Sequence, residues 1–490
     1  MATQANIEHS TEHPQNQDSN YTMLQAFEWY SPGGGVHWKA LKERIGELSS
    51  MGITAMWLPP PTKATNQDSV GYDTYDLWDL GEFEQKGRKS TKYGTKAELI
   101  ELIRHAHDND IAIGVISYVD AVLNHKFGAD RVELFRATRV DSDNRKEEVT
   151  GSYDIKGWTG FDFPGRNGEY SQFKWSFNHF TGIDHDENSG KKAIFRIDGD
   201  GKDWARGVDN ENGNYDYLMG ADIDHSHPEA RDDLLAWGKW VVDEIGAAGF
   251  RFDAIKMFAV GEFWKNSLED IDAYLRDFGT QFSIFDAPLH YKFKDAGESG
   301  ANFDLRTIFD GTLVQCRPMD AVTLVDNHDT QIGQALESWV SPWFKPLAYT
   351  LILLREDGYP CVFYGDLYGC DGGKPQPPVN QLADIIRARK LFGFGETRDA
   401  WDHPNCLGWV RAGNAHHDGC AVVMCNGDEG FKRLNVGEEH AGEKWTDILG
   451  WHGGEVIIGK DGWGEFRCSA QSVSIWTKTD ARGREEFKRS

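Results

Sequence analysis

Eight short apolar runs recur between residues 23 and 365, and this repetition constrains the fold of the chain more than any other feature. Most of the runs are separated by stretches whose apolar residues lie three and four apart, as in a helix. The runs are MLQAFEW (23–29), ITAMWLP (53–59), IAIGVISYV (111–119), GFRFDA (249–254), FAVGEF (258–263), FSIFDAP (282–288), AVTLVDN (321–327) and YPCVFYG (359–365). This alternation favours a parallel sheet covered by helices, and eight repeats predict an α/β fold of the (β/α)₈ TIM-barrel type. In such a barrel the active site lies at the carboxyl ends of the strands.

Two regions of the sequence do not fit a bare barrel. Residues 126–226 are rich in Gly, Asn and Asp and lack a helical period, which predicts an inserted loop-rich domain after strand 3. After residue 396 short strand-like runs alternate with turns, which predicts a C-terminal antiparallel β-sandwich. The expected parts are a disordered tail (1–19), the barrel (20–125 and 227–396), the inserted domain (126–226), the sandwich (397–479) and a second tail (480–490).

Charge and composition exclude several classes of partner. The chain has 78 acidic and 52 basic residues, and its net charge of −26 repels nucleic-acid phosphates and anionic lipid surfaces. The first twenty residues are polar, unlike a secretory signal, and no apolar run is long enough to span a bilayer. The seven cysteines lack the spacing of a zinc site, which favours buried, reduced thiols. We therefore expect a cytoplasmic protein without a nucleic-acid or membrane partner, and its oligomeric state stays open.

Polar and ionisable residues follow four of the predicted strands, where a barrel enzyme places its reactive groups. They are Asp120, Asn124 and His125 in DAVLNH, Arg251 and Asp253 in GFRFDA, Glu262 in VGEFW, and His328 and Asp329 in VDNHD. Any one of these acids could be an ordinary surface or supporting residue, because carboxylates are abundant in this chain. Their joint occurrence at strand ends favours an active site that works through carboxylates.

These four segments resemble the four characteristic sequence regions of the alpha-amylase family of glycoside hydrolases. Further motifs similar to that family occur from Gln25 to Trp476, and they include LQAFEWY, VGYDTYDLWDLGEF, NENGNYDYLMGADID, FDAPLHYKF, FYGDLYG and DGWGEF. The chain is most similar to the bacterial liquefying and fungal intracellular members. The resemblance implies retaining endo-hydrolysis of α-1,4-glucosidic bonds in starch, glycogen or maltooligosaccharides.

The resemblance also implies catalytic roles. Asp253 would be the nucleophile that forms a glycosyl-enzyme ester, and Arg251, on the same face of the strand, would keep it ionised. Glu262 would act first as the general acid and then as the general base. Retention requires these two carboxyl groups to lie about 5 to 5.5 Å apart. Asp329 would be the third catalytic carboxylate and would stabilise the distorted sugar of the transition state.

Substrate and calcium contacts follow from the same resemblance. Substrate binding is implied for Tyr72, His125, Arg251, Lys256 and His328. Calcium ligation is implied for Asn124, Asp216 and Asp222, with carbonyls and waters as the remaining oxygen ligands of Ca²⁺. Without the resemblance, aspartates in Gly- and Asn-rich loops more often cap turns than bind metal.

The spacing between Asp253 and Glu262 departs from the family. The resemblance implies a helical crossover of some twenty residues at this point, but only Ile255, Lys256 and Met257 separate the two predicted strands. A parallel neighbour needs a crossover of about a dozen residues, whereas three residues reach only about 11 Å. We therefore expect a barrel without the crossover helix between strands 4 and 5, in which the second of these strands cannot return to pair in parallel. An altered splice form or an incomplete gene sequence would have this pattern.

Displaced carboxylates predict weak or absent catalysis, because angstrom-scale misplacement of catalytic groups is costly. Two other functions stay open. An α-glucan transglycosylase would use the same residues and would differ in its products when an acceptor sugar is added. A catalytically inactive glucan-binding relative would bind glucan without releasing reducing ends.

Overall fold

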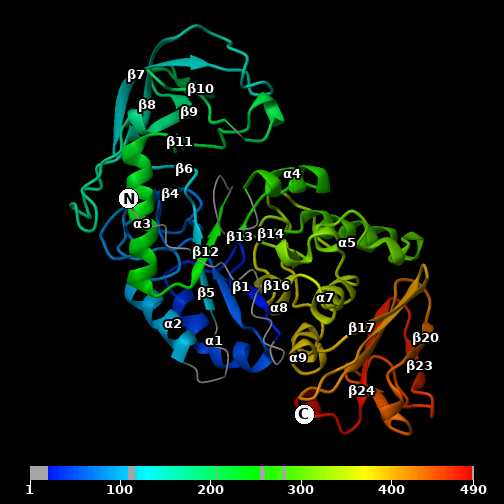
Figure 1. Cartoon of the computed structure of the whole chain (residues 1–490). Helices are drawn as coiled ribbons and strands as arrows, with labels where there is room; N and C mark the ends of the chain where they lie inside the picture. The colour runs from blue at the N-terminus through cyan, green and yellow to red at the C-terminus, as the bar shows by residue number, and fades with distance from the viewer. Residues whose placement is uncertain (1–19, 109–115, 207, 254–259, 279–282, 488–490) are drawn as a thin grey trace, which may run out of the picture. The chain divides into compact units, whose positions relative to one another are not determined.

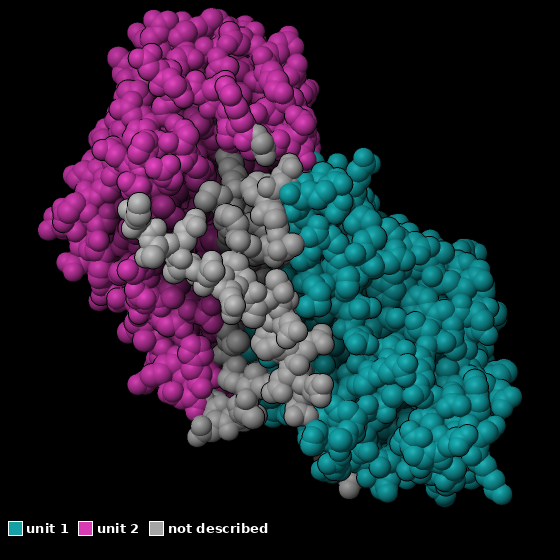
Figure 2. Space-filling model, in the orientation of Figure 1, with its two compact units in different colours: residues 1–28, 47–55, 264–490 teal, residues 29–46, 56–263 magenta. Residues whose placement is uncertain are grey.

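The computed structural model describes residues 20–108, 116–206, 208–253, 260–278 and 283–487. The chain forms two compact units, which Figure 2 shows in different colours. Unit 1 comprises residues 1–28, 47–55 and 264–490, and unit 2 comprises residues 29–46 and 56–263. Each unit contains its own run of parallel strands.

Unit 2 contains parallel strands in the order β2, β5, β12 and β13; Figure 1 labels β5, β12 and β13. Their bounds are Ala55–Leu58 (β2, whose first residue belongs to unit 1), Ile116–Ala121 (β5), Gly249–Phe252 (β12) and Val260–Gly261 (β13). In the register of β5 and β12, Asp120 is the direct neighbour of Arg251. Within β12 the alternation in GFRFDA turns Arg251 and Asp253 to the same face.

The pairing of β12 with β13 corrects one sequence-based expectation. Arg251 lies opposite Val260 in a parallel pair, and the Glu262 amide donates to the Phe252 carbonyl at 3.3 Å. The prediction that this segment cannot return to a parallel strand is therefore wrong. It assumed a strand of full length, whereas β13 has only two residues and lies beside the carboxyl end of β12.

Helices of unit 2 follow ordinary start and stop signals. They are α1 (His37–Met51, which extends into unit 1), α2 (Lys96–Asp108) and α3 (Pro228–Ile245). Helix α3 starts with Pro228 in its first turn and ends before Gly246, whose φ of 72° is left-handed. The buried face of α3 has apolar residues three and four apart: Ala230, Leu234, Trp237, Val241 and Ile245.

The inserted region after the third barrel strand is more regular than its composition indicates. It contains an antiparallel sheet in the order β6, β11, β9, β10, β7, β8. The bounds are His125–Lys126 (β6), Ala221–Ile223 (β11), Phe180–Asp186 (β9), Lys191–Ile197 (β10), Arg131–Arg139 (β7) and Tyr153–Gly160 (β8). Two short strands, β3 (Lys63–Ala64) and β4 (Thr74–Asp76), form a separate pair.

Unit 1 contains the other parallel strands, in the order β1, β16, β15 and β14. They span Met23–Gln25 (β1), Tyr359–Phe363 (β16), Ala321–Leu324 (β15) and Ile284–Phe285 (β14). The helices of this part are α4 (Leu268–Phe278), α5 (Ala287–Ser299), α6 (Leu313–Cys316), α7 (Lys345–Leu354), α8 (Tyr364–Tyr368) and α9 (Leu382–Phe392). Every residue of α7 is buried, so this helix forms part of the core of the unit.

Two antiparallel sheets end unit 1. The larger has the order β17, β18, β19, β24, β21, β22, and the smaller pairs β20 with β23. The bounds are Thr397–His403 (β17), Cys406–Arg411 (β18), Cys420–Cys425 (β19), Ser472–Lys478 (β24), Lys444–Asp447 (β21), Val456–Ile457 (β22), Gly430–Asn435 (β20) and Trp463–Cys468 (β23). Side chains of both sheets, among them Val423, Phe466 and Trp476, share one buried apolar cluster, as in a sandwich.

The observed elements confirm the predicted fold class: eight parallel barrel strands, an insertion after the third and antiparallel C-terminal sheets. Among the described helices, none is both long and apolar enough to cross a bilayer.

Candidate active site

The guanidinium of Arg251 is the centre of the polar cluster in unit 2. Its Nη1 donates to Asp120 Oδ1 at 2.9 Å and to Asp253 Oδ1 at 3.1 Å, and its Nη2 donates to Glu262 Oε2 at 2.5 Å. Arg251 is 1% exposed, whereas the Asp253 and Glu262 side chains are 12% and 13% exposed. Both predicted catalytic carboxylates therefore bind the planar guanidinium of Arg251, and each carboxylate side chain remains partly exposed to solvent.

Asp120 is the fully buried counter-ion of this cluster. Its Oδ2 accepts hydrogen bonds from Trp57 Nε1 at 3.0 Å and from the Tyr72 hydroxyl at 2.8 Å. The Arg251 guanidinium also lies 4.6 Å from the centre of the Trp57 ring, within the range of a cation–π contact. Three elements thus fix the position of Arg251 before any substrate binds.

Opposing effects act on the protonation of Arg251. Burial alone would lower the pKa of Arg251, but the carboxylates of Asp120, Glu262 and Asp253 and the Tyr72 side chain raise it well above its usual value. Arg251 therefore remains a cation at every pH at which the protein is folded.

An aromatic and histidine layer lies beside this cluster. The ring of Trp29 stacks parallel to that of Tyr72, with centroids 6.1 Å apart. His125 Nε2 hydrogen-bonds the Tyr72 carbonyl at 2.8 Å, so it donates its proton there and carries its lone pair on Nδ1. Parallel aromatic faces with exposed edges are suited to the apolar face of a sugar ring.

Unit 1 holds the remaining predicted site residues, His328 and Asp329. The Gln25 amide donates to His328 Nδ1 at 3.0 Å, which leaves the imidazole proton on Nε2. That Nε2 lies 3.2 Å from Asp329 Oδ2 and donates to it. His328 is 1% exposed and the Asp329 side chain is 24% exposed, so Gln25 and His328 together orient a carboxylate that solvent reaches.

A buried ion network supports the loop that carries Asp329. Lys345 Nζ contacts Asp326 Oδ2 at 2.8 Å and also bonds Asp366. Asp326 Oδ1 in turn accepts the Thr330 hydroxyl at 2.8 Å, and the side chain of Asn327 accepts the backbone amide of Asp329 at 2.8 Å. Burial of these charges is tolerated because each is paired.

The three predicted calcium ligands are all buried in unit 2. Asn124, Asp216 and Asp222 are 4%, 1% and 0% exposed. Asp222 on β11 lies opposite His125 on β6, next to Asn124, and Asp222 Oδ2 also accepts the Thr181 hydroxyl. Carboxylate and amide oxygens are the hard donors that Ca²⁺ takes, so this donor set fits the ion.

A second group of possible metal ligands does not fit calcium. His179, His227 and Glu229 bring their ligand atoms within 4.8 Å of one another. Imidazole nitrogens suit transition metals rather than Ca²⁺. The Ser176 amide donates to His179 Nδ1 at 2.9 Å, which leaves the proton on Nε2, the atom that lies 3.4 Å from Glu229. This contact is therefore a hydrogen bond, and His179 is not positioned as a metal ligand.

The structure brings Arg251, Asp253, Glu262 and Tyr72 into one cluster, and it brings His328 to Asp329. Lys256 lies outside the described residues, so its predicted contact stays a prediction. The sequence singled out Asp120 at a strand end, within β5, but assigned it no role. The predicted site residues did not include Gln25, for which a single sequence offers no signal, because an amide at a strand end is common.

Two family models match the chain. The model "Alpha amylase, catalytic domain" covers residues 17–296, and "Alpha-amylase C-terminal" covers residues 421–477. A glucan 1,4-alpha-maltohexaosidase of Bacillus sp. (strain 707) is 47% identical over 482 residues, which are 94% of this chain and 92% of that protein. The cytoplasmic alpha-amylase of Escherichia coli (strain K12) is 43% identical over 491 residues, which are 93% of this chain and 98% of that protein.

A solved structure agrees at the level of the fold. The crystal structure of an alpha-amylase from Geobacillus thermoleovorans complexed with acarbose has a TM-score of 0.58 and 17% identity, and the match covers 95% of this chain and 99% of that one. The catalytic-domain model matches more than half of the chain, and the relatives above 40% identity match nearly all of it. The chain therefore belongs to the alpha-amylase family and is a glycoside hydrolase that acts on α-glucans.

Proposed function

We propose that the protein hydrolyses internal α-1,4-glucosidic bonds with retention of anomeric configuration, through Asp253 and Glu262. The observation that carries the proposal is the convergence of both carboxylates on the Arg251 guanidinium, each with a partly exposed edge. Two carboxylates that contact one guanidinium lie close together, which supports a two-step displacement by this pair.

In the first step the Asp253 carboxylate attacks the anomeric carbon, and Glu262 gives its proton to the leaving glycosidic oxygen. In the second step Glu262 removes a proton from water, and that water displaces Asp253 from the ester. Arg251 holds Asp253 in position, while Asp120 holds Arg251. Asp329 stabilises positive charge that develops on the sugar.

Turnover is expected to be lower than in relatives with a full crossover. A general acid must turn its carboxyl towards the leaving oxygen, whereas Glu262 Oε2 here lies 2.5 Å from Arg251 Nη2. Glu262 must leave this contact for each catalytic cycle. The short connection from Asp253 to Glu262, which keeps the two on neighbouring strand ends, is the sequence feature behind the contact.

Substrate binding is assigned to Tyr72, His125, Arg251, Lys256 and His328. Support for Tyr72 comes from its stacking with Trp29, which makes a two-ring surface for a glucose unit. Support for the two histidines comes from their hydrogen-bonded, fixed ring orientations. These contacts would hold α-glucan chains rather than polyanions.

Bound calcium would join the end of β5 to the inserted region. Asn124, Asp216 and Asp222 would supply oxygen ligands, and the ion would neutralise two buried carboxylates. The compartment is proposed to be the cytosol. The name of the Escherichia coli relative and the seven free cysteines support this assignment.

The test is hydrolysis of soluble starch and maltoheptaose by the purified chain, followed by reducing-end release and product size. We expect slow release of mixed maltooligosaccharides with α-configuration in the NMR spectrum of fresh product. Asp253→Asn and Glu262→Gln should remove this activity, and Asp270→Asn and Glu269→Gln, two exposed acids near the start of α4, should keep it.

Other outcomes would contradict the proposal in distinct ways. Longer products in the presence of added glucose or maltose would identify a transglycosylase. Starch binding without any release of reducing ends would identify an inactive glucan-binding relative. Product of inverted configuration would refute the retaining mechanism.

A further inference from the structure

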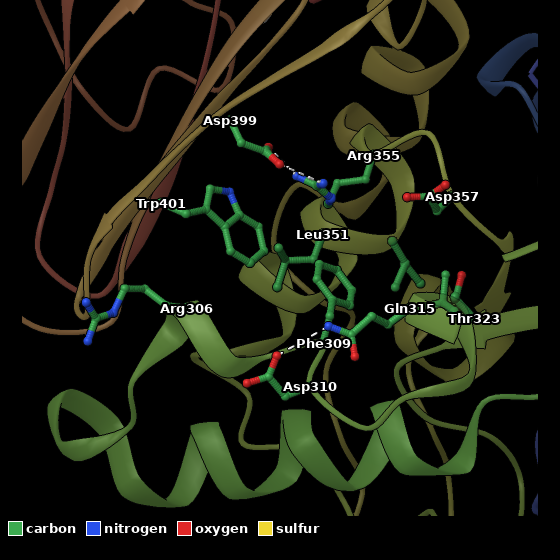
Figure 3. Close-up of a pocket in the computed structure, with 12 residues that line it drawn as sticks. Arg306, Phe309, Asp310, Gln315, Thr323, Leu351, Arg355, Asp357, Asp399 and Trp401 are labelled. Atoms are coloured by element: carbon green, nitrogen blue, oxygen red, sulfur yellow. Dashed lines mark hydrogen bonds and ion pairs between the residues drawn. The ribbon is translucent and has the colours of Figure 1, made fainter. Parts of the chain in front are cut away.

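A partly open pocket in unit 1 is lined by none of the predicted site residues. It has a volume of about 280 Å³ and is bordered by the segment from η4 (Leu305–Thr307) to α6, by β15, by the end of α7 and by β17. Figure 3 shows Trp401 and Asp399 from β17 opposite Arg355, with Phe309 and Asp310 at the other side and Thr323 at one end. This volume lies just below the usual range of ligand pockets, which begins at about 300 Å³, so it suits only a small ligand.

An aromatic and charged frame holds the mouth of the pocket in place. Arg355 forms two hydrogen bonds with Asp399, at 2.7 and 3.1 Å. Its guanidinium also lies 4.9 Å from the Trp401 ring centre, and Trp401 stacks on Phe309 with centroids 5.7 Å apart. The frame is therefore built by contacts between its own side chains and does not depend on a ligand for its order.

Two lining side chains have polar atoms without a hydrogen-bond partner in the described part of the chain. They are the Thr323 hydroxyl and Trp401 Nε1, and Thr323 is only 1% exposed. A buried polar group that stays unpaired is unfavourable. A rotation that turns the Thr323 hydroxyl into the pocket therefore breaks no hydrogen bond.

The remaining lining groups define the chemistry of a ligand. Asp310 and Asp357 offer only acceptors and so require donors, whereas Arg355 and Trp401 offer only donors and so require acceptors. A hydroxyl group both donates and accepts, so one hydroxyl-rich molecule satisfies both sets. Two arginines and three aspartates nearly balance in charge, which disfavours a strongly charged ligand. Apolar side chains such as Leu351 and Ile352 suit the C–H face of a ring.

We propose that this pocket binds a neutral sugar, one or two hexose rings in size, separately from the candidate active site. The ligand is either a free sugar or the end of an α-glucan chain, since both present the same hydroxyl edge and C–H face. The binding does not depend on whether the chain hydrolyses starch.

A thiol beside the pocket offers a direct probe. Cys316 on α6 is exposed and the other six cysteines of the chain are buried, so a thiol-reactive fluorophore attaches at this position. Its neighbours Val314 and Gln315 line the pocket. The labelled full-length protein is titrated with glucose, maltose and glycogen, and with sodium phosphate as a charged control. We expect a saturable change with a sugar and none with phosphate.

Matched variants assign the signal to the pocket. Thr323→Val and Asp310→Asn should each weaken sugar binding by about tenfold, because each removes one hydrogen bond without a change of shape. Trp401→Phe should act in the same direction, while Trp463→Phe, an exposed Trp on β23, should have no effect. Tyr72→Ala should also leave the titration unchanged, because Tyr72 belongs to the candidate active site.

Each outcome of the titration is decisive. Saturation by glucose or maltose identifies a free sugar as a sufficient ligand, and saturation by glycogen alone identifies a chain end. An absent response to every sugar, or equal affinities in Thr323→Val, Asp310→Asn and the unchanged protein, overturns the proposal. Starch turnover, measured in parallel, separates this failure from a failure of the proposed catalytic function.

Discussion

Replacing Arg251 tests the arrangement of carboxylates in unit 2. Arg251 is 1% exposed and binds Asp120, Asp253 and Glu262 at once. Arg251→Met keeps most of the side-chain volume and removes every one of these bonds. Removing one partner of a buried ion pair costs about 3 to 5 kcal/mol, because the remaining charge stays buried without compensation. We expect the free energy of unfolding to fall by about 3 kcal/mol or more, and starch hydrolysis to be lost.

The assay is urea unfolding followed by tryptophan fluorescence, with reducing-end release measured on the same preparations. The double variant Arg251→Met/Asp120→Asn should recover part of the lost stability, since the buried charge of Asp120 is removed as well. Arg398→Met, which breaks an exposed ion pair with Glu396, should unfold like the unchanged protein. A loss below about 1 kcal/mol in Arg251→Met, with turnover preserved, would refute this reasoning.

Three further predictions follow from buried groups. Burial lowers the pKa of His290 to about 4, so the unfolded chain binds more protons than the folded one between pH 6.5 and pH 4. The free energy of unfolding should therefore fall as the pH falls through that window, by about 3 kcal/mol more than in His290→Gln. Urea unfolding at each pH measures this difference, and parallel pH curves for the two proteins would contradict the prediction. Removing calcium with EDTA should lower the melting temperature, and Asp222→Asn should abolish this effect of EDTA, whereas a chelator-insensitive melting curve would argue against the site. Native protein should react with one equivalent of a thiol reagent at Cys316 and denatured protein with seven; more than one fast native thiol would disprove the buried placement of the others.

Sequence periodicity was sufficient for the barrel but not for the inserted region. Apolar runs such as AVTLVDN are buried on both faces of the barrel sheet, and they stand out in any sequence. The strands β7 and β8 have exposed polar residues at alternate positions and are surrounded by Gly and Asp. Their antiparallel pairing depends on contacts between strands that are distant in the sequence, so composition alone indicated loops.

The candidate site was partly predictable for a similar reason. The alternation of Arg251 and Asp253 follows from strand geometry, and both were expected on one face. The contact of Glu262 with Arg251 depends on a parallel pairing that the short spacing between the strands was thought to forbid. The role of Asp120 depends on the register between β5 and β12, which no local pattern encodes.

Covalent trapping tests the central claim most directly. The purified protein is incubated with a fluorinated α-glucosyl fluoride, which forms the ester quickly and releases it slowly, and the digested product is examined by mass spectrometry. A two-step displacement predicts one added sugar on the peptide that contains Asp253, and no label in Asp253→Asn. A label on another carboxylate, or steady starch hydrolysis without any trapped ester, would contradict the account.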